Sequence, residues 1–116
     1  MFKITGTTIE VTRGDSMAIN FSIDGYTFTP GDKVEFRVYN AKGLNEEPLL
    51  SKVVYINEVT EIVRIEISPL ETKIGEMINK AITYWYEIEL NDASTIIGYD
   101  EDGAKELILY PEGVEE

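Results

Sequence analysis

The sequence predicts an all-β fold, an antiparallel β-sandwich of seven to eight short strands with one short crossover helix. Apolar and polar residues alternate strictly in several short segments, and turn-forming residues separate these segments. A single stretch breaks the alternation and begins with a helix-capping pattern. The length of 116 residues fits one domain, which we assign to residues 1–116.

Four segments carry the clearest alternation: 17–23, 33–39, 62–67 and 82–90. In each, one side of the strand is apolar and the other is polar, as expected for half-buried antiparallel strands. In the segment 33–39, for example, Val34, Phe36 and Val38 share the apolar face.

The remaining strands are expected from weaker patterns, at 9–12, 49–56, 95–99 and 105–110. Residues typical of turns lie between the strands, because glycine, asparagine, aspartate and proline favour tight bends. These turns are expected at 14–15, 24–25, 30–32, 40–43, 91–92 and 102–103.

The segment 68–79 is expected to form the crossover helix. Its first residues, Ser68-Pro69-Leu70-Glu71, match a capping box, in which the serine hydroxyl and the glutamate carboxylate each accept from a backbone amide. Proline suits the first helical position because no amide proton is needed there. Gly75 is expected to end the helix after about one turn.

Residues 13–16 read Arg-Gly-Asp-Ser, the letters of a cell-adhesion tetrapeptide. A strand is expected on each side of them, and Gly14 and Asp15 are turn residues because glycine adopts positive φ and aspartate can cap its own backbone. The adhesion interpretation requires an exposed tip, which nothing in the sequence supports. We therefore interpret the tetrapeptide as a bend between two strands.

Residues 100–103, Asp-Glu-Asp-Gly, raise the question of a calcium site, because clustered carboxylates supply the oxygen ligands that Ca²⁺ prefers. The stretch lacks the spacing and the distal glutamate of the common calcium-binding loop. Asp-Gly between two strands is also a strong hairpin signal. We expect a plain hairpin, and we predict no metal and no cofactor.

The composition excludes several kinds of site. The chain has no cysteine and no histidine, which excludes zinc sites built on thiolate or imidazole ligands. The same absence excludes Ser-His-Asp triads and Cys-His nucleophiles.

The charge argues against two kinds of partner. With 22 acidic and 10 basic residues the net charge is −12, whereas nucleic acid and anionic membranes are bound through clustered Lys and Arg.

No apolar run reaches the roughly 18 residues of a transmembrane helix, and residues 1–10 lack the order of a signal peptide. We therefore expect a soluble protein that binds neither nucleic acid nor membrane.

Paired carboxylates raise one enzymatic alternative, a glycoside hydrolase. Glu87 and Glu89 share one face of the strand at 82–90. This spacing is also that of the polar side of any amphipathic strand. We expect both residues to be solvated surface, and we predict that the protein is not an enzyme.

Aromatic residues supply the candidate contact residues, which are Trp85, Tyr39 and Tyr55. Trp85, the only tryptophan, lies on the polar face of its strand, where an aromatic side chain is typical of an interface or a sugar platform. Tyr84 and Tyr86 fall on the apolar face of the same strand and are expected to fill the core.

Five stretches span most of the chain in a recognisable order: VTRGDSMAINFSI, GDKVEFRVYN, ISPLETK, YWYEIEL and AKELILYPEG. In this order they resemble the immunoglobulin-like N-terminal domain of phage baseplate upper proteins and related prophage tail proteins of Gram-positive bacteria. The resemblance implies an immunoglobulin-like sandwich in which the Arg-Gly-Asp stretch is a strand-entry feature. It transfers no catalytic residue to this chain.

The resemblance also implies a function. The expected role is a non-enzymatic structural or adaptor domain of a phage or prophage tail, located in the virion tail or in the host cytoplasm before assembly. Its expected partners are other tail or baseplate subunits, or further copies of itself. The alternative is a carbohydrate- or cell-wall-binding β-sandwich module with an exposed aromatic platform. Fold alone does not separate these functions.

Overall fold

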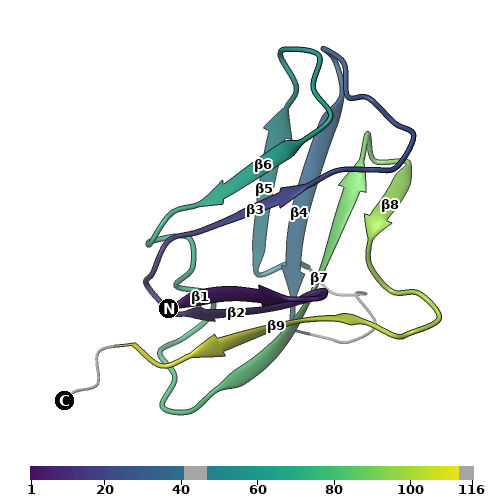
Figure 1. Ribbon diagram of the computed structural model, residues 1–116. Helices are drawn as coiled ribbons and strands as arrows, with labels where there is room; N and C mark the ends of the chain where they lie inside the picture. Colours follow the sequence, from purple (N-terminus) through teal and green to yellow (C-terminus); the bar gives the residue numbers. More distant parts are fainter. Residues whose placement is uncertain (41–46, 113–116) are drawn as a thin grey trace.

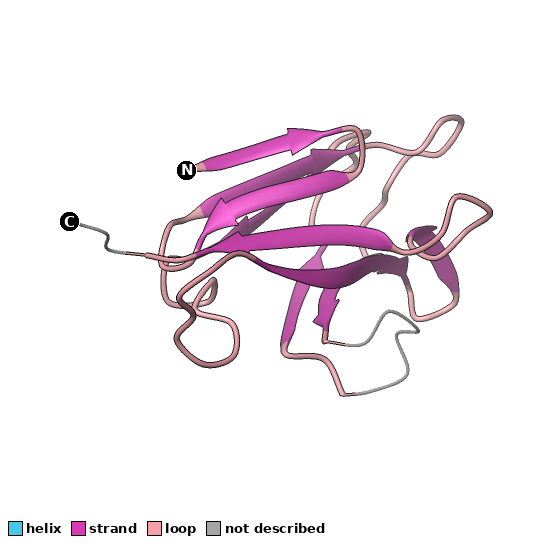
Figure 2. Cartoon of the chain, turned by 90° about the horizontal axis from the view of Figure 1, so that it is seen from below, coloured by secondary structure: helices cyan, strands magenta, loops and turns pink. Residues whose placement is uncertain are grey.

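The computed structural model describes residues 1–40 and 47–112, so the turn expected at 40–43 lies outside the described residues except for Asn40. The described residues form strands and no helix (Figures 1 and 2), and so contain no helix suited to crossing a membrane. The strands are β1 (Phe2–Thr5), β2 (Thr8–Thr12), β3 (Met17–Phe21), β4 (Lys33–Tyr39), β5 (Leu50–Tyr55), β6 (Val63–Ile67), β7 (Ile82–Leu90), β8 (Ser94–Ile97) and β9 (Lys105–Tyr110). The prediction of an all-β fold is confirmed.

The strands form two sheets of unequal size. Seven strands make the main sheet, in the order β1-β2-β9-β7-β4-β5, with β8 pairing with β7 beyond the end of β9. β3 and β6 form a two-stranded sheet that crosses one face of the main sheet (Figure 1). The main sheet twists strongly, so that β1, β2 and β9 run across the direction of β4 and β5 (Figure 1).

Two details of the expected sheet are wrong. The expected seven to eight strands omit β1, which has only four residues, pairs with β2 across Gly6 at a φ of +62° and is mostly exposed. The sheet is also not wholly antiparallel, because β2 pairs with β9 in parallel, with Ile9 opposite Leu107. β2 leads directly into β3, which belongs to the other sheet, so β3 does not pair with β2. The second neighbour of β2 is instead β9, whose direction is already set by its antiparallel pairing with β7.

The core lies between the two sheets. The strands β4 and β7 have the predicted bounds, and the predicted alternation of burial is present in β7 and in β4 as far as Val38, with Val34, Phe36 and Val38 fully buried. Tyr84 and Tyr86 are buried as predicted, and the Tyr86 hydroxyl donates to a backbone carbonyl. The two-stranded sheet covers these residues with its own apolar side, which consists of Met17, Ile19, Val63, Ile65 and Ile67.

The helix expected at 68–79 does not form, although its capping box does. The Ser68 amide donates to Glu71 Oε1 at 2.9 Å, and the Glu71 amide donates to Ser68 Oγ at 3.2 Å. After one turn the chain leaves the helical path, because Thr72 and Ile74 are both buried. Residues two apart point to different sides of a helix, so a helix could not bury both against one surface.

The β7–β8 hairpin turns at Asn91-Asp92, as predicted. Both residues have positive φ, 55° and 57°, and the Ala93 amide donates to the Leu90 carbonyl at 3.0 Å. Positive φ at both central residues is characteristic of a type I′ turn, whose twist suits paired strands. The Asn91 side chain accepts from the Lys33 amide at 2.7 Å, which attaches this hairpin to the start of β4.

Candidate functional site

The face of the main sheet that points away from β3 and β6 is the first candidate surface. It carries the polar sides of β4 and β7 and the residues of β5 and β9 in register with them. We call this set the outer face. Its residues are Lys33, Glu35, Arg37, Tyr39, Ser51, Val53, Tyr55, Thr83, Trp85, Glu87, Glu89, Glu106 and Ile108.

Arg37 lies at the centre of the outer face and joins β4 to β7. Its Nη1 group donates to Glu89 Oε1 at 2.7 Å and to Glu87 Oε2 at 3.2 Å. Its Nη2 group donates to Glu35 Oε1 at 2.7 Å. Glu35 in turn accepts from the Ser51 hydroxyl of β5. One guanidinium therefore holds three carboxylates in a network that spans β5, β4 and β7.

The network shifts the pKa values of its members. Burial alone would lower the pKa of Arg37, but the carboxylates of Glu89 and Glu35 outweigh it and raise that pKa above its usual value. The Ser51 hydroxyl, and then the guanidinium, lower the pKa of Glu35. Burial, with a hydrogen bond to a carboxylate, raises the pKa of Tyr39 to about 12. At neutral pH the centre of the outer face is therefore a paired, charged cluster.

The three predicted contact residues differ in how far their side chains are exposed. Tyr39 is 5% exposed and its hydroxyl donates to Glu87 Oε2 at 2.7 Å, so little of it can meet a partner. Trp85 lies beside Tyr39 and Glu106 in register, and is partly exposed. Tyr55, at the end of β5, is 67% exposed. A contact role stays a prediction, and Trp85 and Tyr55 are the residues placed to fulfil it.

The two carboxylates considered for hydrolysis have a structural role. Glu87 and Glu89 both accept from Arg37, which holds β4 against β7. A hydrolase needs one carboxyl group free to donate a proton to a substrate, and this arrangement offers none at the pair. Within residues 1–40 and 47–112, no three acidic side chains converge as a metal site.

The edge of β5 is the second candidate surface. Within the described residues β5 pairs only with β4. The carbonyls of Val38 in β4 and of Asp32, just before β4, both point toward β5. Val38 O accepts from the Leu49 amide at 2.7 Å, and Asp32 O accepts from the Ile56 amide at 2.9 Å. Antiparallel alternation then directs the amides and carbonyls at positions 51, 53 and 55 away from β4.

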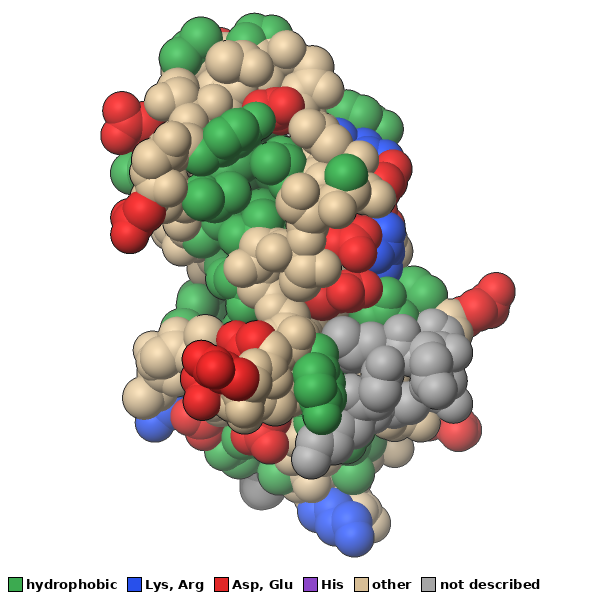
Figure 3. Space-filling model, turned by 90° about the vertical axis from the view of Figure 1, so that its right-hand side faces the viewer, with side chains coloured by type: hydrophobic (Ala, Val, Ile, Leu, Met, Phe, Trp, Pro, Cys, Tyr) green, Lys and Arg blue, Asp and Glu red, His purple; other side chains and the backbone are tan. Residues whose placement is uncertain are grey.

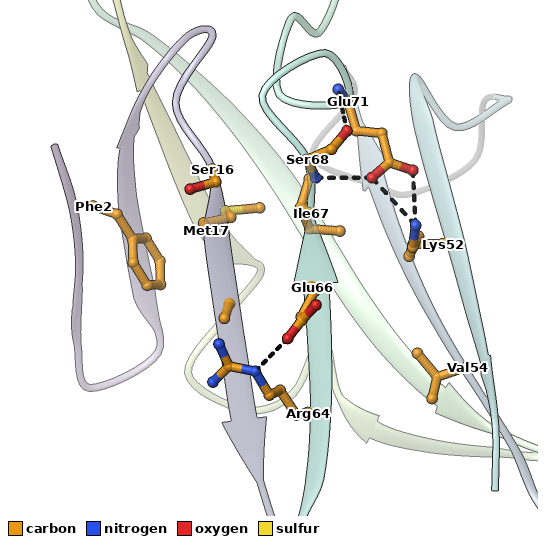
Figure 4. A pocket seen from close by; sticks show the side chains of 11 residues that line it. Phe2, Ser16, Met17, Lys52, Val54, Arg64, Glu66, Ile67, Ser68 and Glu71 are labelled. Carbon is orange, nitrogen blue, oxygen red and sulfur yellow. Dashed lines mark hydrogen bonds and ion pairs between the residues drawn. The ribbon is translucent and has the colours of Figure 1, made fainter.

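A groove lies on the inner side of this edge. A hollow of about 740 Å³ spreads over β3 and β6, with Phe2 of β1 on one side and Lys52 and Val54 of β5 on the other (Figure 4). A second hollow of about 290 Å³ shares Val54 with the first and extends to Ile62. We call the part between β5 and β6 the β5–β6 groove. Lys52 bridges it by binding Glu71 at 3.0 Å.

A third, apolar surface lies on the side of the molecule that carries β8 and the β3–β4 connection. Hydrophobic side chains gather there beside acidic ones (Figure 3). In the end of β3, the residues after it and β8, Phe21, Ile23, Ile96 and Ile97 are only partly buried. The two-stranded sheet is too narrow to cover the whole inner face of the main sheet, which accounts for this exposure.

The Arg-Gly-Asp-Ser stretch is the bend between β2 and β3, and that prediction is confirmed. Arg13 is 8% exposed and donates to the Gly75 carbonyl at 3.0 Å. Gly14 has a φ of +92° and its amide donates to Thr72 Oγ1 at 3.0 Å. Asp15 pairs with the N-terminal amine. The arginine is occupied inside the protein, so the tetrapeptide is not presented as an adhesion site.

The stretch at 100–103 forms a turn, but not the expected hairpin. Asp100 and Gly103 exchange backbone hydrogen bonds, at 2.9 and 3.3 Å. Lys105 Nζ donates to Asp100 Oδ1 at 2.6 Å and lowers the pKa of that carboxyl. The flanking strands β8 and β9 both pair antiparallel with β7, one after the other. They therefore point in the same direction and cannot form a hairpin.

Sequence reasoning missed the Arg37 network and the free edge of β5. The network has a sequence signal, a single arginine and several glutamates on the polar sides of two strands, but only the β4–β7 register brings them together. The free edge has no signal in the residues of β5. It follows from the strand order, which leaves β5 last in its sheet.

Comparison of the chain with protein-family models, with curated proteins and with solved structures returned no match. Its role is therefore inferred from its surfaces and from the order of its sequence motifs.

Proposed function

We propose that this chain is a non-enzymatic structural or adaptor domain of a phage or prophage tail, which acts by binding neighbouring baseplate or tail subunits. The observation that carries the proposal is the edge of β5, six residues long, which pairs with no second strand among residues 1–40 and 47–112. An unpaired edge is a template for main-chain pairing with another chain. The ordered motifs that resemble baseplate upper proteins supply the biological setting.

We also propose that the fold is immunoglobulin-like. Support comes from the chain path, which passes between the two sheets from β2 to β3, from β3 to β4, from β5 to β6 and from β6 to β7. Repeated crossing between two facing sheets is typical of immunoglobulin-like sandwiches. The buried, alternating residues of β4, β6 and β7 agree with this architecture.

The proposed partners are tail or baseplate subunits, in the virion tail or in the host cytoplasm before assembly. Exposed aromatic and aliphatic side chains favour a protein partner, because aromatic residues are enriched at interfaces. Tyr55 is 67% exposed and Val53 is 37% exposed, both on the outer face of β5. The net charge of −12 disfavours nucleic acid and anionic membrane as partners.

Mass spectrometry of tail particles tests this function. Particles are purified from the source strain after prophage induction, with a strain that lacks the gene as the control. We expect peptides of this chain at a fixed stoichiometry to known tail proteins. Intact particles without the chain, from cells that produce it, would refute the tail proposal.

Trp85 favours one alternative, a carbohydrate- or cell-wall-binding module. Its indole is partly exposed on the outer face beside Thr83 and Glu106, where a sugar ring could stack. Titration with purified wall polysaccharide, followed by tryptophan fluorescence, separates the two functions. Saturable quenching would favour the sugar-binding module. Because Trp85→Phe removes the fluorescent reporter, binding of the polysaccharide to this variant is measured by calorimetry. An unchanged signal would favour the adaptor.

A further inference from the structure

We propose that β5 pairs with β5 of a second copy of this chain, antiparallel and about a two-fold axis at Val53, so that two main sheets join into one. This inference rests on the proposed function, since it names the partner of the edge that the adaptor role invokes. It adds the strand, the register and the kind of partner.

The backbone of β5 sets the register. Ser51, Val53 and Tyr55 direct their amides and carbonyls away from β4. When Val53 lies opposite Val53 of the second copy, Ser51 lies opposite Tyr55 on both sides of the axis. Each of these pairs can then exchange both of its backbone hydrogen bonds. The arrangement is self-complementary, as a two-fold interface must be.

The local charge permits two copies to meet although the whole chain is strongly acidic. β5 contains no aspartate and no glutamate, and its one charged residue, Lys52, is already bound to Glu71. Glu35, the nearest carboxylate on the outer face of β4, is held by Arg37 at 2.7 Å. Pairing along residues 50–55 therefore places no unpaired carboxylate directly opposite another. The net charge of −12, with the exposed Glu47 and Glu58 just beyond the two ends of the strand, still opposes association and limits its strength.

β5 also lacks most features that protect natural edge strands, which are proline, bulges, charges and short length. It has no proline, and it pairs with β4 over six residues without a shift of register. The opposite edge of the main sheet differs. β1 has four residues, and its Lys3 is paired with Glu10 at 3.6 Å. Of the two strands that end the strand order, β1 and β5, β5 is the one suited to pairing.

The second strand would cover the β5–β6 groove. In the second copy, Leu50 and Val54 lie on the inner side of β5, the side that faces β3 and β6. Placed beside the first β5, they extend over the groove near Val54 and Ile62. A single pair of strands is a small interface. We therefore expect a dimer that dissociates on dilution and that is favoured where assembly raises the local concentration.

Sedimentation equilibrium of the full chain over a range of concentrations tests the pairing. The unmodified chain is expected to show a monomer–dimer equilibrium. Val53→Lys and Val53→Glu should each be monomeric where the unmodified chain is mostly dimer, because the axis places like charges opposite each other. An equimolar mixture of the two variants should restore the dimer, since lysine then faces glutamate. This rescue is specific to the register.

Two further variants serve as controls. Val53→Pro removes the outward amide at the axis without removing a bond to β4, and should also abolish the dimer. Thr5→Lys places a charge on β1, the opposite edge, and should leave the dimer unchanged. Circular dichroism and thermal melting establish that each variant is folded, as expected because Val53 is 37% exposed.

Three results would overturn the pairing: a monomer at every concentration, a dimer that does not respond to changes at Val53, or a dimer lost in Thr5→Lys. These results are separable from the tail proposal. A monomeric chain found in tail particles would refute only the β5 pairing, whereas a β5 dimer missing from the particles would refute only the tail role.

Discussion

Thr72 is a fully buried polar residue that holds two distant loops together. Its hydroxyl donates to the Asp15 carbonyl at 2.7 Å and accepts from the Gly14 amide at 3.0 Å. We expect Thr72→Val to lower the free energy of unfolding by about 1–3 kcal/mol, because buried backbone groups lose their partner. Thr72→Ser keeps the hydroxyl and should recover most of this loss. Urea unfolding measures both, and a Thr72→Val variant as stable as the unmodified protein would show that the hydroxyl contributes nothing.

Asn91 combines a left-handed backbone with side-chain hydrogen bonds. Its φ is 55°, and its side chain accepts from the Lys33 amide and donates to Asp32. Asn91→Gly should lose only the side-chain bonds, whereas Asn91→Ala should lose about 1 kcal/mol more, since alanine disfavours positive φ. Thermal unfolding of the two variants gives this difference. A glycine variant as unstable as the alanine variant would contradict the role of the backbone conformation.

At the scale of elements, Arg37 connects β4 to β7 and, through Glu35, to β5. Arg37→Met should destabilise the protein by about 1–3 kcal/mol at pH 7, because it leaves three glutamates facing one another. Arg37→Lys keeps the charge without the forked geometry, and should lose less.

The effect of Arg37→Met should depend on pH in a defined direction. The pKa of Glu35 is lowered in the folded state, so the stability that this pairing contributes is present above the unfolded value of about 4.3. It is lost as the pH falls through the folded value. Denaturant unfolding at several pH values should therefore show the variant and the parent converging below about pH 4. A constant difference down to acid pH would argue against a charge-based role.

The segment after β6 shows how tertiary packing overrides a local signal at the scale of an element. The capping box of Ser68 and Glu71 is a correct sequence signal, and its hydrogen bonds form. A helix also needs further turns that bury one of its faces. Here Thr72 is hydrogen-bonded to the bend at Gly14 and Ile74 packs in the core. The capping box therefore stabilises a single turn and not a helix.

At the scale of the whole molecule, acid should unfold the protein through carboxyl groups that are hydrogen-bonded in the fold. The Thr29 amide lowers the pKa of Asp32, and the Ser68 amide lowers the pKa of Glu71. Other carboxyl groups with a lowered pKa are Glu35, Asp92 and Asp100. Their contribution to stability is complete above the unfolded values of about 3.9 and 4.3, and is lost as the pH falls through the folded values. Urea midpoints between pH 7 and pH 3 should fall mainly below about pH 4, and a steep fall between pH 7 and pH 5 would contradict this account.

The candidate site was predictable only in part. Trp85 and Tyr55 were identifiable as aromatic residues on the polar sides of their strands, and both are exposed to some degree. Tyr39 follows the same pattern but is buried, and its hydroxyl donates to Glu87 of the neighbouring strand. A strand's own alternation tells which face a residue occupies, and the register with the next strand decides how that face is covered.

The sequence by itself determined the all-β class, the bounds of β4 and β7, and the bend at Arg13-Gly14-Asp15-Ser16, because alternation and turn chemistry are local properties of the chain. Only the tertiary structure decided the parallel pairing of β2 with β9, the loss of the helix after Ser68, the carboxylate network around Arg37 and the free edge of β5. These features depend on contacts between residues far apart in the chain, and such contacts are set by the shared core that all the strands must bury together.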